Sequence, residues 1–237
     1  MLFFLDNGDV RTIKPGQVLV FLLLLVPIIV LGVGTTILLL SGLPLGDFRG
    51  ITLVAAAVVV TYLYAFLVYR LFLHVMPLAE GYIEERTRDE LAAHVHFLFY
   101  LVLFNSLIRT NFLPVPLLRL IYLALGARLG SNTYVVGVIL DPPLAHIGAN
   151  CIIGHDAVLF SHAIEGKRLS LAAIHIGNNV TIGAKAVIMS GVSIADGAIV
   201  SAGAVVSKGK RIAEGEIWGG VPARRLEEAA PAGPASH

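Results

Sequence analysis

The stretch IGNNVTIGAKAVIMSGVSIADGAIVSAGAVV, residues 176–206, has an aliphatic residue at every sixth position. Those positions are Ile176, Ile182, Ile188, Ile194, Val200 and Val206. A small or β-branched residue follows four positions later, at Val180, Ala186, Val192, Ala198 and Ala204. This period matches neither the 3.6 residues of a helix turn nor the two-residue alternation of a strand. It predicts short strands joined by turns and coiled around a triangular core, which is a β-helix.

The same pattern runs earlier, over residues 129–159, through Leu129, Val135, Ile147, Ile153 and Leu159. Asp141 is the one polar residue at an inward position of the repeat. At about 18 residues a rung, we expect roughly four or five rungs between 128 and 226, about 4.8 Å apart. An ordinary sandwich is disfavoured, because its strands do not hold one register over so many repeats.

The N-terminal half carries most of the hydrophobic excess of a chain that is 57% hydrophobic. Residues 15–46 hold no charge, and Val18 to Leu40 is long enough to span a bilayer. A second uncharged run, 50–69, follows a short Gly- and Pro-containing link. We therefore expect two transmembrane helices within residues 1–76. A cleaved signal peptide is the competing interpretation of the first run, although its apolar region would be about half as long.

Basic residues favour one orientation of this helical hairpin. Only Arg49 lies at the link, whereas the two ends carry Arg11, Lys14, Arg70, Arg86 and Arg88. Because positive charge is retained in the cytoplasm, both ends are predicted there. The expected protein is an integral protein of the cell inner membrane with its β-helix facing the cytoplasm.

Residues 77–127 are expected to form cytoplasmic or interfacial amphipathic helices. Residues 80–90 are predicted to be solvated and helix-prone. Residues 91–108 have no formal charge and could form a third span. We favour a surface or re-entrant helix, because a third span would place the β-helix on the side of the membrane opposite to the one that the charges favour. Residues 117–125 should form a short apolar helix against the bilayer that caps the first rung, with ordinary core helices as the alternative. Residues 227–237 are expected to be disordered.

The repeat breaks at residues 165–173, directly after His162. A loop leaving a regular scaffold is a common place for function, because the scaffold fixes its ends. The single cysteine, Cys151, occupies a small inward position and is expected to pack rather than react. A net charge of +1 gives no indication of nucleic-acid binding.

Several runs resemble the hexapeptide-repeat acyltransferases, such as the maltose, galactoside and serine acetyltransferases. The resemblance covers residues 126–226 and is carried by LGARLG at 125–130, IGNNVTIGA at 176–184 and WGGVPAR at 218–224. The run His162 to Gly166 is also similar to β-helix domains of large membrane-bound peptide synthetases. The resemblance implies a left-handed parallel β-helix, a homotrimer, and acetyl-CoA or another acyl-CoA as donor.

In this family, a histidine beside the extruded loop is the general base, and His162 holds the matching position. The alternative is that His162 only anchors the loop. Asp141 either caps a turn or orients His162 or the substrate. His155 and His175 are weaker candidates, and His146 borders the same cleft in one interpretation. The matching cofactor positions are Ala184, Ala202, Ser207, Lys208 and Arg224, with Arg211 as a further phosphate ligand.

The favoured function is a membrane-anchored O- or N-acyltransferase whose acceptor lies at the membrane, such as a glycan or lipid-linked precursor. A zinc-dependent lyase of the carbonic-anhydrase type is a second possibility, with His155, His162 and His175 available; its ligand spacing is absent, so no metal site is expected. A non-catalytic trimeric scaffold is the third.

Overall fold

The computed structural model describes residues 11–44, 46–110 and 113–226, in two compact units. Of the described residues, those up to 110 together with 164–169 form the helical unit, and 113–163 and 170–226 form the β-helix unit. The predicted disordered tail, 227–237, lies outside the described residues.

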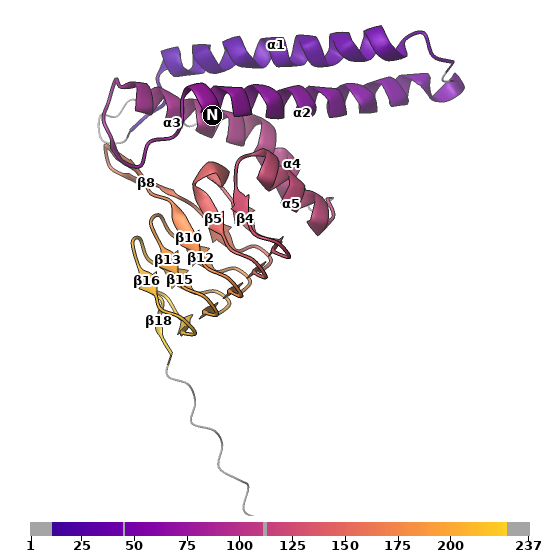
Figure 1. Ribbon diagram of the computed structural model, residues 1–237. Coiled ribbons are helices and arrows are strands. Elements are labelled where there is room, and N and C mark those ends of the chain that lie inside the picture. Colours follow the sequence, from indigo (N-terminus) through magenta and orange to yellow (C-terminus); the bar gives the residue numbers. More distant parts are fainter. Residues whose placement is uncertain (1–10, 45, 111–112, 227–237) are drawn as a thin grey trace, which may run out of the picture. The chain divides into compact units, whose positions relative to one another are not determined.

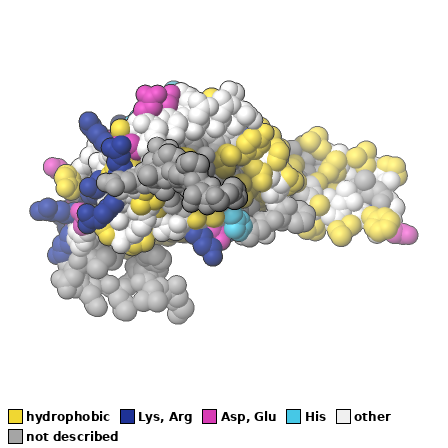
Figure 2. All heavy atoms as spheres, turned by 90° about the horizontal axis from the view of Figure 1, so that it is seen from below, with side chains coloured by type: hydrophobic (Ala, Val, Ile, Leu, Met, Phe, Trp, Pro, Cys, Tyr) yellow, Lys and Arg dark blue, Asp and Glu magenta, His cyan; other side chains and the backbone are white. Residues whose placement is uncertain are grey.

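Two long helices form the hairpin expected in the helical unit (Figure 1). Helix α1 runs over Pro15–Leu40, and α2 over Arg49–Val75 after a short 3₁₀ turn at Gly46–Phe48. The helices pack closely at Gly32, where an added Cβ would lie 2.7 Å from the Cα of Thr61. Exposed hydrophobic side chains lie along both helices, and Figure 2 shows in yellow the hydrophobic side chains on the face that it draws.

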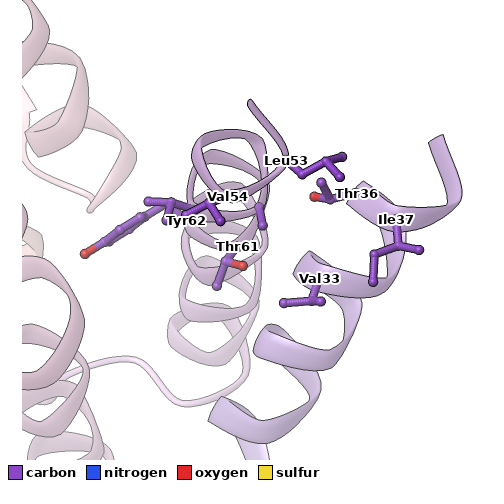
Figure 3. Close-up of a pocket in the computed structure, with 9 residues that line it drawn as sticks. Val33, Thr36, Ile37, Leu53, Val54, Thr61 and Tyr62 are labelled. Carbon is purple, nitrogen blue, oxygen red and sulfur yellow. The ribbon is translucent and has the colours of Figure 1, made fainter. Parts of the chain in front are cut away.

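An apolar groove of about 460 Å³ lies between these two helices (Figure 3). Its lining is Val33, Thr36, Ile37, Leu53, Val54, Ala57, Val58, Thr61 and Tyr62. In the part of the chain that the structure describes, three helical stretches are long and apolar enough to cross a membrane: 15–40, 46–75 and 88–109.

The third stretch is helical as expected for residues 91–108, but it is not uniform. It consists of α3 at Arg88–Phe99, a π-helical turn at Tyr100–Phe104 and α4 at Asn105–Arg109. Half of its most apolar window is buried inside the unit. His96 is fully buried, and its Nδ1 lies 2.8 Å from the hydroxyl of Tyr69 in α2.

The prediction for residues 80–90 was wrong in two respects. Gly81–Ile83 forms a strand, β1, and Glu90 is only 1% exposed. The Glu90 carboxylate is buried because Arg11 Nη2 and Lys14 Nζ reach it at 2.8 and 3.2 Å. Arg11 also donates from Nη1 to the Ile83 carbonyl at 2.6 Å, and its backbone N–H donates to the Gly166 carbonyl at 3.2 Å.

We predict that Glu90→Ala destabilises the helical unit by about 3–5 kcal/mol, because it leaves Arg11 buried without its carboxylate. The measurement is the free energy of unfolding in detergent by denaturant titration. Glu84→Ala is the matched control, since Glu84 is exposed. Equal stability of the two variants would contradict the buried ion pair.

The β-helix unit begins with a short helix, α5, at Val115–Ala124, and continues as a three-sided coil of five rungs. The first sheet holds β2 (Arg128–Leu129), β5 (Ala145–Ile147), β10 (Ile174–Ile176), β13 (Ser193–Ile194) and β16 (Arg211–Ile212). The second holds β3 (Tyr134–Val135), β6 (Ile152–Ile153), β11 (Thr181–Ile182), β14 (Ile199–Val200), β17 (Ile217–Gly219) and β18 (Arg224–Arg225). The third holds β4 (Val138–Ile139), β7 (Val158–Leu159), β12 (Val187–Ile188) and β15 (Val205–Val206). The predicted β-helix is thereby confirmed, and the pairings are parallel except that of β17 with β18.

The repeating aliphatic residues form the core of this coil. Ile182, Ile188, Val200 and Val206 are fully buried and stack on their counterparts in neighbouring rungs. Helix α5 closes one end, as predicted: the Tyr122 hydroxyl donates to the Gly137 carbonyl at 3.0 Å and accepts from the Ile139 N–H at 3.2 Å.

The first rung corrects the predicted register. Ile139, not Asp141, faces the core opposite Leu159, so this pairing spans twenty residues instead of the usual eighteen. The extra residues enlarge the corner before β5, where Pro142–Leu144 form a 3₁₀ turn. In the next rung the same corner carries an eleven-residue insertion, because β5 pairs with β10 at a spacing of 29 residues. Two irregular corners therefore lie one above the other.

Candidate active site

The insertion at the second corner is a β-hairpin rather than the loop predicted over residues 165–173. Strand β8 covers His162–Glu165 and β9 covers Arg168–Leu171, and β9 pairs with both β8 and β1. His162 is the first residue of β8, so it stands where the chain leaves the regular coil. Its position is set by the β-helix, which fixes Leu159 against Ile188 immediately before it.

Asp141 meets His162 at this corner. The Asp141 Oδ2 atom accepts the backbone N–H groups of Ser161 and His162 at 2.7 and 3.1 Å. His162 Nδ1 lies 2.8 Å from Oδ2 and 3.0 Å from Oδ1 of the same carboxylate. A carboxylate only accepts hydrogen bonds, so Nδ1 carries the proton, and the lone pair of a neutral ring is at Nε2. Asp141 therefore orients His162, which was one of its two predicted roles.

Burial differs sharply between these two side chains. The side chain of Asp141 is 0% exposed, and that of His162 is 26% exposed. Burial is the largest influence on the His162 pKa and lowers it, but the hydrogen bond and charge of Asp141 together outweigh burial and raise the pKa above its ordinary value. The imidazole thus gains proton affinity while keeping access to solvent.

Sequence reasoning missed two serines, Ser161 and Ser190, that form hydrogen bonds next to the Asp141–His162 pair. The buried Ser190 hydroxyl donates to the Ser161 carbonyl at 2.8 Å, and the Ser161 hydroxyl donates to the Leu144 carbonyl at 3.4 Å. They join the two irregular corners to the rung that follows. The repeat contained no signal for this, since a serine is an ordinary small residue at a corner.

The other candidate histidines lie elsewhere on the β-helix. His146 and His175 are neighbours on β5 and β10, with their Nδ1 atoms 3.3 Å apart. His155 is exposed, with Nε2 3.5 Å from Asp156. Cys151 is buried as predicted, and burial raises the pKa of its thiol. Among the described residues, no three His, Cys, Asp or Glu side chains are grouped so as to hold a metal ion.

The residues matched to cofactor binding lie on successive corners and strands. Ala184 and Ala202 are exposed and stacked, with the Gly203 N–H donating to the Ala184 carbonyl at 2.9 Å. Ser207 and Lys208 follow β15, and Lys208 Nζ lies 3.1 Å from Ser170 Oγ in β9. Lys208 therefore contacts the hairpin base, while Arg211 in β16 and Arg224 in β18 are exposed.

The profile of the family described as "Bacterial transferase hexapeptide (six repeats)" matches residues 173–208. This part of the chain is similar to the hexapeptide repeats of bacterial transferases. It includes β10 to β15 and begins where the hairpin rejoins the coil.

The chain is also similar to one curated protein and to several solved structures. A Delta-poly-L-ornithine synthetase of Acinetobacter baumannii is 31% identical over 105 residues, which are 43% of this chain but only 8% of that protein. A hexapeptide-repeat acetyltransferase of Vibrio cholerae, solved with acetyl-CoA, is 28% identical over 43% of this chain and 60% of its own, with a TM-score of 0.39. A galactoside acetyltransferase solved with coenzyme A is 21% identical over 62% of this chain and 86% of its own, with a TM-score of 0.48.

We predict that Asp141→Asn lowers the pKa of His162, because the substitution removes the charge that favours the imidazolium. The pKa is measured by NMR titration of labelled histidine in the detergent-solubilised protein. At a fixed pH, the NMR signals of His155, which has its own neighbour Asp156, should be the same in the variant and the wild type. An unchanged His162 pKa would show that Asp141 does not control its protonation.

Proposed function

We propose that this protein is a membrane-anchored acyltransferase that moves an acetyl or other acyl group from acyl-CoA to a hydroxyl or amine, with His162 as general base. The observation that carries the proposal is the Asp141–His162 pair at the root of a hairpin extruded from a hexapeptide β-helix. The hairpin replaces a regular corner at one point, next to a titratable side chain that remains partly exposed.

The reaction follows from the tautomer that Asp141 imposes. The acceptor's hydroxyl oxygen or amine nitrogen attacks the thioester carbonyl. As it does so, Nε2 of the neutral His162 ring takes the acceptor's proton. The new carbon–oxygen or carbon–nitrogen bond forms, the carbon–sulfur bond breaks, and the imidazolium returns the proton to the departing CoA thiolate. Asp141 stabilises the imidazolium between these two steps and does not itself take the proton.

The donor would lie along the corners that carry Ala184 and Ala202. Their exposed small side chains leave room for the pantetheine arm to approach the backbone groups. Ser207 and Lys208 follow on the next corner of the coil, and Arg211 and Arg224 can meet the phosphates with charge-assisted hydrogen bonds. Lys208 has a second role, because its contact with Ser170 joins the donor side to the hairpin base.

The helical unit supports a membrane-associated acceptor. Residues 1–76 would anchor the protein in the inner membrane, residues 77–127 would lie at its cytoplasmic face, and residues 128–226 would act from the cytoplasm. Exposed apolar side chains along α1 and α2 support this assignment. An anchored enzyme is suited to a membrane-associated acceptor such as a glycan or lipid-linked precursor, and the hexapeptide repeat supports assembly as a homotrimer.

We expect His162→Ala to lower the rate of acyl transfer from acetyl-CoA by about 10²–10⁴-fold, the usual contribution of a positioned base. The assay follows release of free CoA thiol by the purified protein with membrane extract as acceptor source. His155→Ala, another exposed imidazole on the β-helix, is the control and should keep the wild-type rate.

Equal rates for His162→Ala and the wild type would rule out the assigned base. Failure to bind CoA in calorimetry would instead favour the non-catalytic scaffold.

A further inference from the structure

His146 and His175 form a pair on the first sheet of the β-helix, separate from the Asp141–His162 pair. They sit at the centres of β5 and β10, which are parallel and in register, so their side chains leave adjacent strands at the same level. The flanking residues of both strands are buried, whereas His146 is half-buried and His175 exposed. Both imidazoles therefore lie on the outer surface.

The two rings face each other with the same atom, Nδ1. Their Nδ1 atoms are 3.3 Å apart, and the rings meet edge to face with centroids 4.8 Å apart. Two ligand nitrogens at about 2.0–2.1 Å from one metal ion and at a near-tetrahedral angle are separated by about that distance. The parallel strands thus hold the two Nδ1 atoms at the distance expected between two ligands of one metal ion.

The surroundings leave the other coordination positions open. The pair borders a shallow hollow of about 400 Å³ on the first sheet, whose lining also includes Arg128, Gly148 and Gly177. The glycines present no side chain that would crowd an incoming ion. Because the described residues contain no grouping of three His, Cys, Asp or Glu, the remaining ligands would be water or a donor from another molecule.

We propose that His146 and His175 bind a divalent transition-metal ion of the class that prefers imidazole, with the two Nδ1 atoms as ligands. Cu²⁺ should bind most tightly and Zn²⁺ less so, following the general order for nitrogen sites. Each ring binds as a neutral imidazole with its proton at Nε2. The ring that carries Nδ1–H loses that proton to solvent and takes one at Nε2, so binding releases no net proton and involves no redox step.

The position of this site gives binding a structural consequence. His146 precedes the eleven-residue insertion and His175 follows it, so the ion joins the two rungs between which the hairpin leaves the coil. An ion that binds the folded state and not the unfolded one stabilises the fold in proportion to its saturation. Metal binding at this site would therefore stabilise the base of the hairpin that begins with His162.

The test uses the full-length, tag-free protein in detergent, with Cu²⁺ as the probe. Electron paramagnetic resonance at one equivalent of Cu²⁺ should show coupling to two imidazole nitrogens, and titration should give one tight site per chain. His175→Thr, which suits an outward strand position, should lose at least about tenfold in Cu²⁺ affinity and show one nitrogen. His146→Thr should behave in the same way.

His155→Thr is the matched control, since His155 is exposed on the same unit but has Asp156 rather than a histidine as its neighbour. It should keep the wild-type affinity and spectrum. A wild-type spectrum in His175→Thr, or an equal loss in His155→Thr, would overturn the proposal. Circular dichroism of each variant confirms that the β-helix is folded, and the spectrum of the wild type decides the proposal even if a variant does not fold.

Discussion

A carboxylate buried in the wall of a β-helix needs hydrogen-bond donors, and the Asp141 side chain has three. Without partners, burial of an ionised carboxylate would cost many kcal/mol. Two of the donors are the backbone N–H groups of Ser161 and His162, which point at Asp141 only because the chain turns outward there. The third is the imidazole itself. The corner geometry and the histidine tautomer are therefore fixed by a single buried charge.

This charge lies where it does because two irregular corners stack. The regular rungs repeat at eighteen residues. The first rung has two extra residues at the corner before β5, and the next rung extrudes the β8–β9 hairpin at the same place. The regular rungs supply the rigid frame, while the departures from the repeat supply the polar groups.

The sequence was sufficient for the coil, for its number of rungs and for the capping helix, because each depends on a periodic apolar pattern. It also located the break that follows His162. The first-rung register could not be predicted, since Asp141 falls on the six-residue period while Ile139 occupies the inward place. The buried Glu90 was missed because its partners, Arg11 and Lys14, are far away in sequence. Lys208 was matched to phosphate binding, and its contact with Ser170 depends on the folded hairpin.

The central claim is that the Asp141–His162 corner is the place where acyl transfer occurs. The most direct measurement is an experimental structure of the protein with bound CoA. The account predicts the CoA sulfur within about 4 Å of His162 Nε2, close enough for proton transfer directly or through one water. A CoA thiol ending on another face of the β-helix, with His162 facing bulk solvent alone, would contradict it.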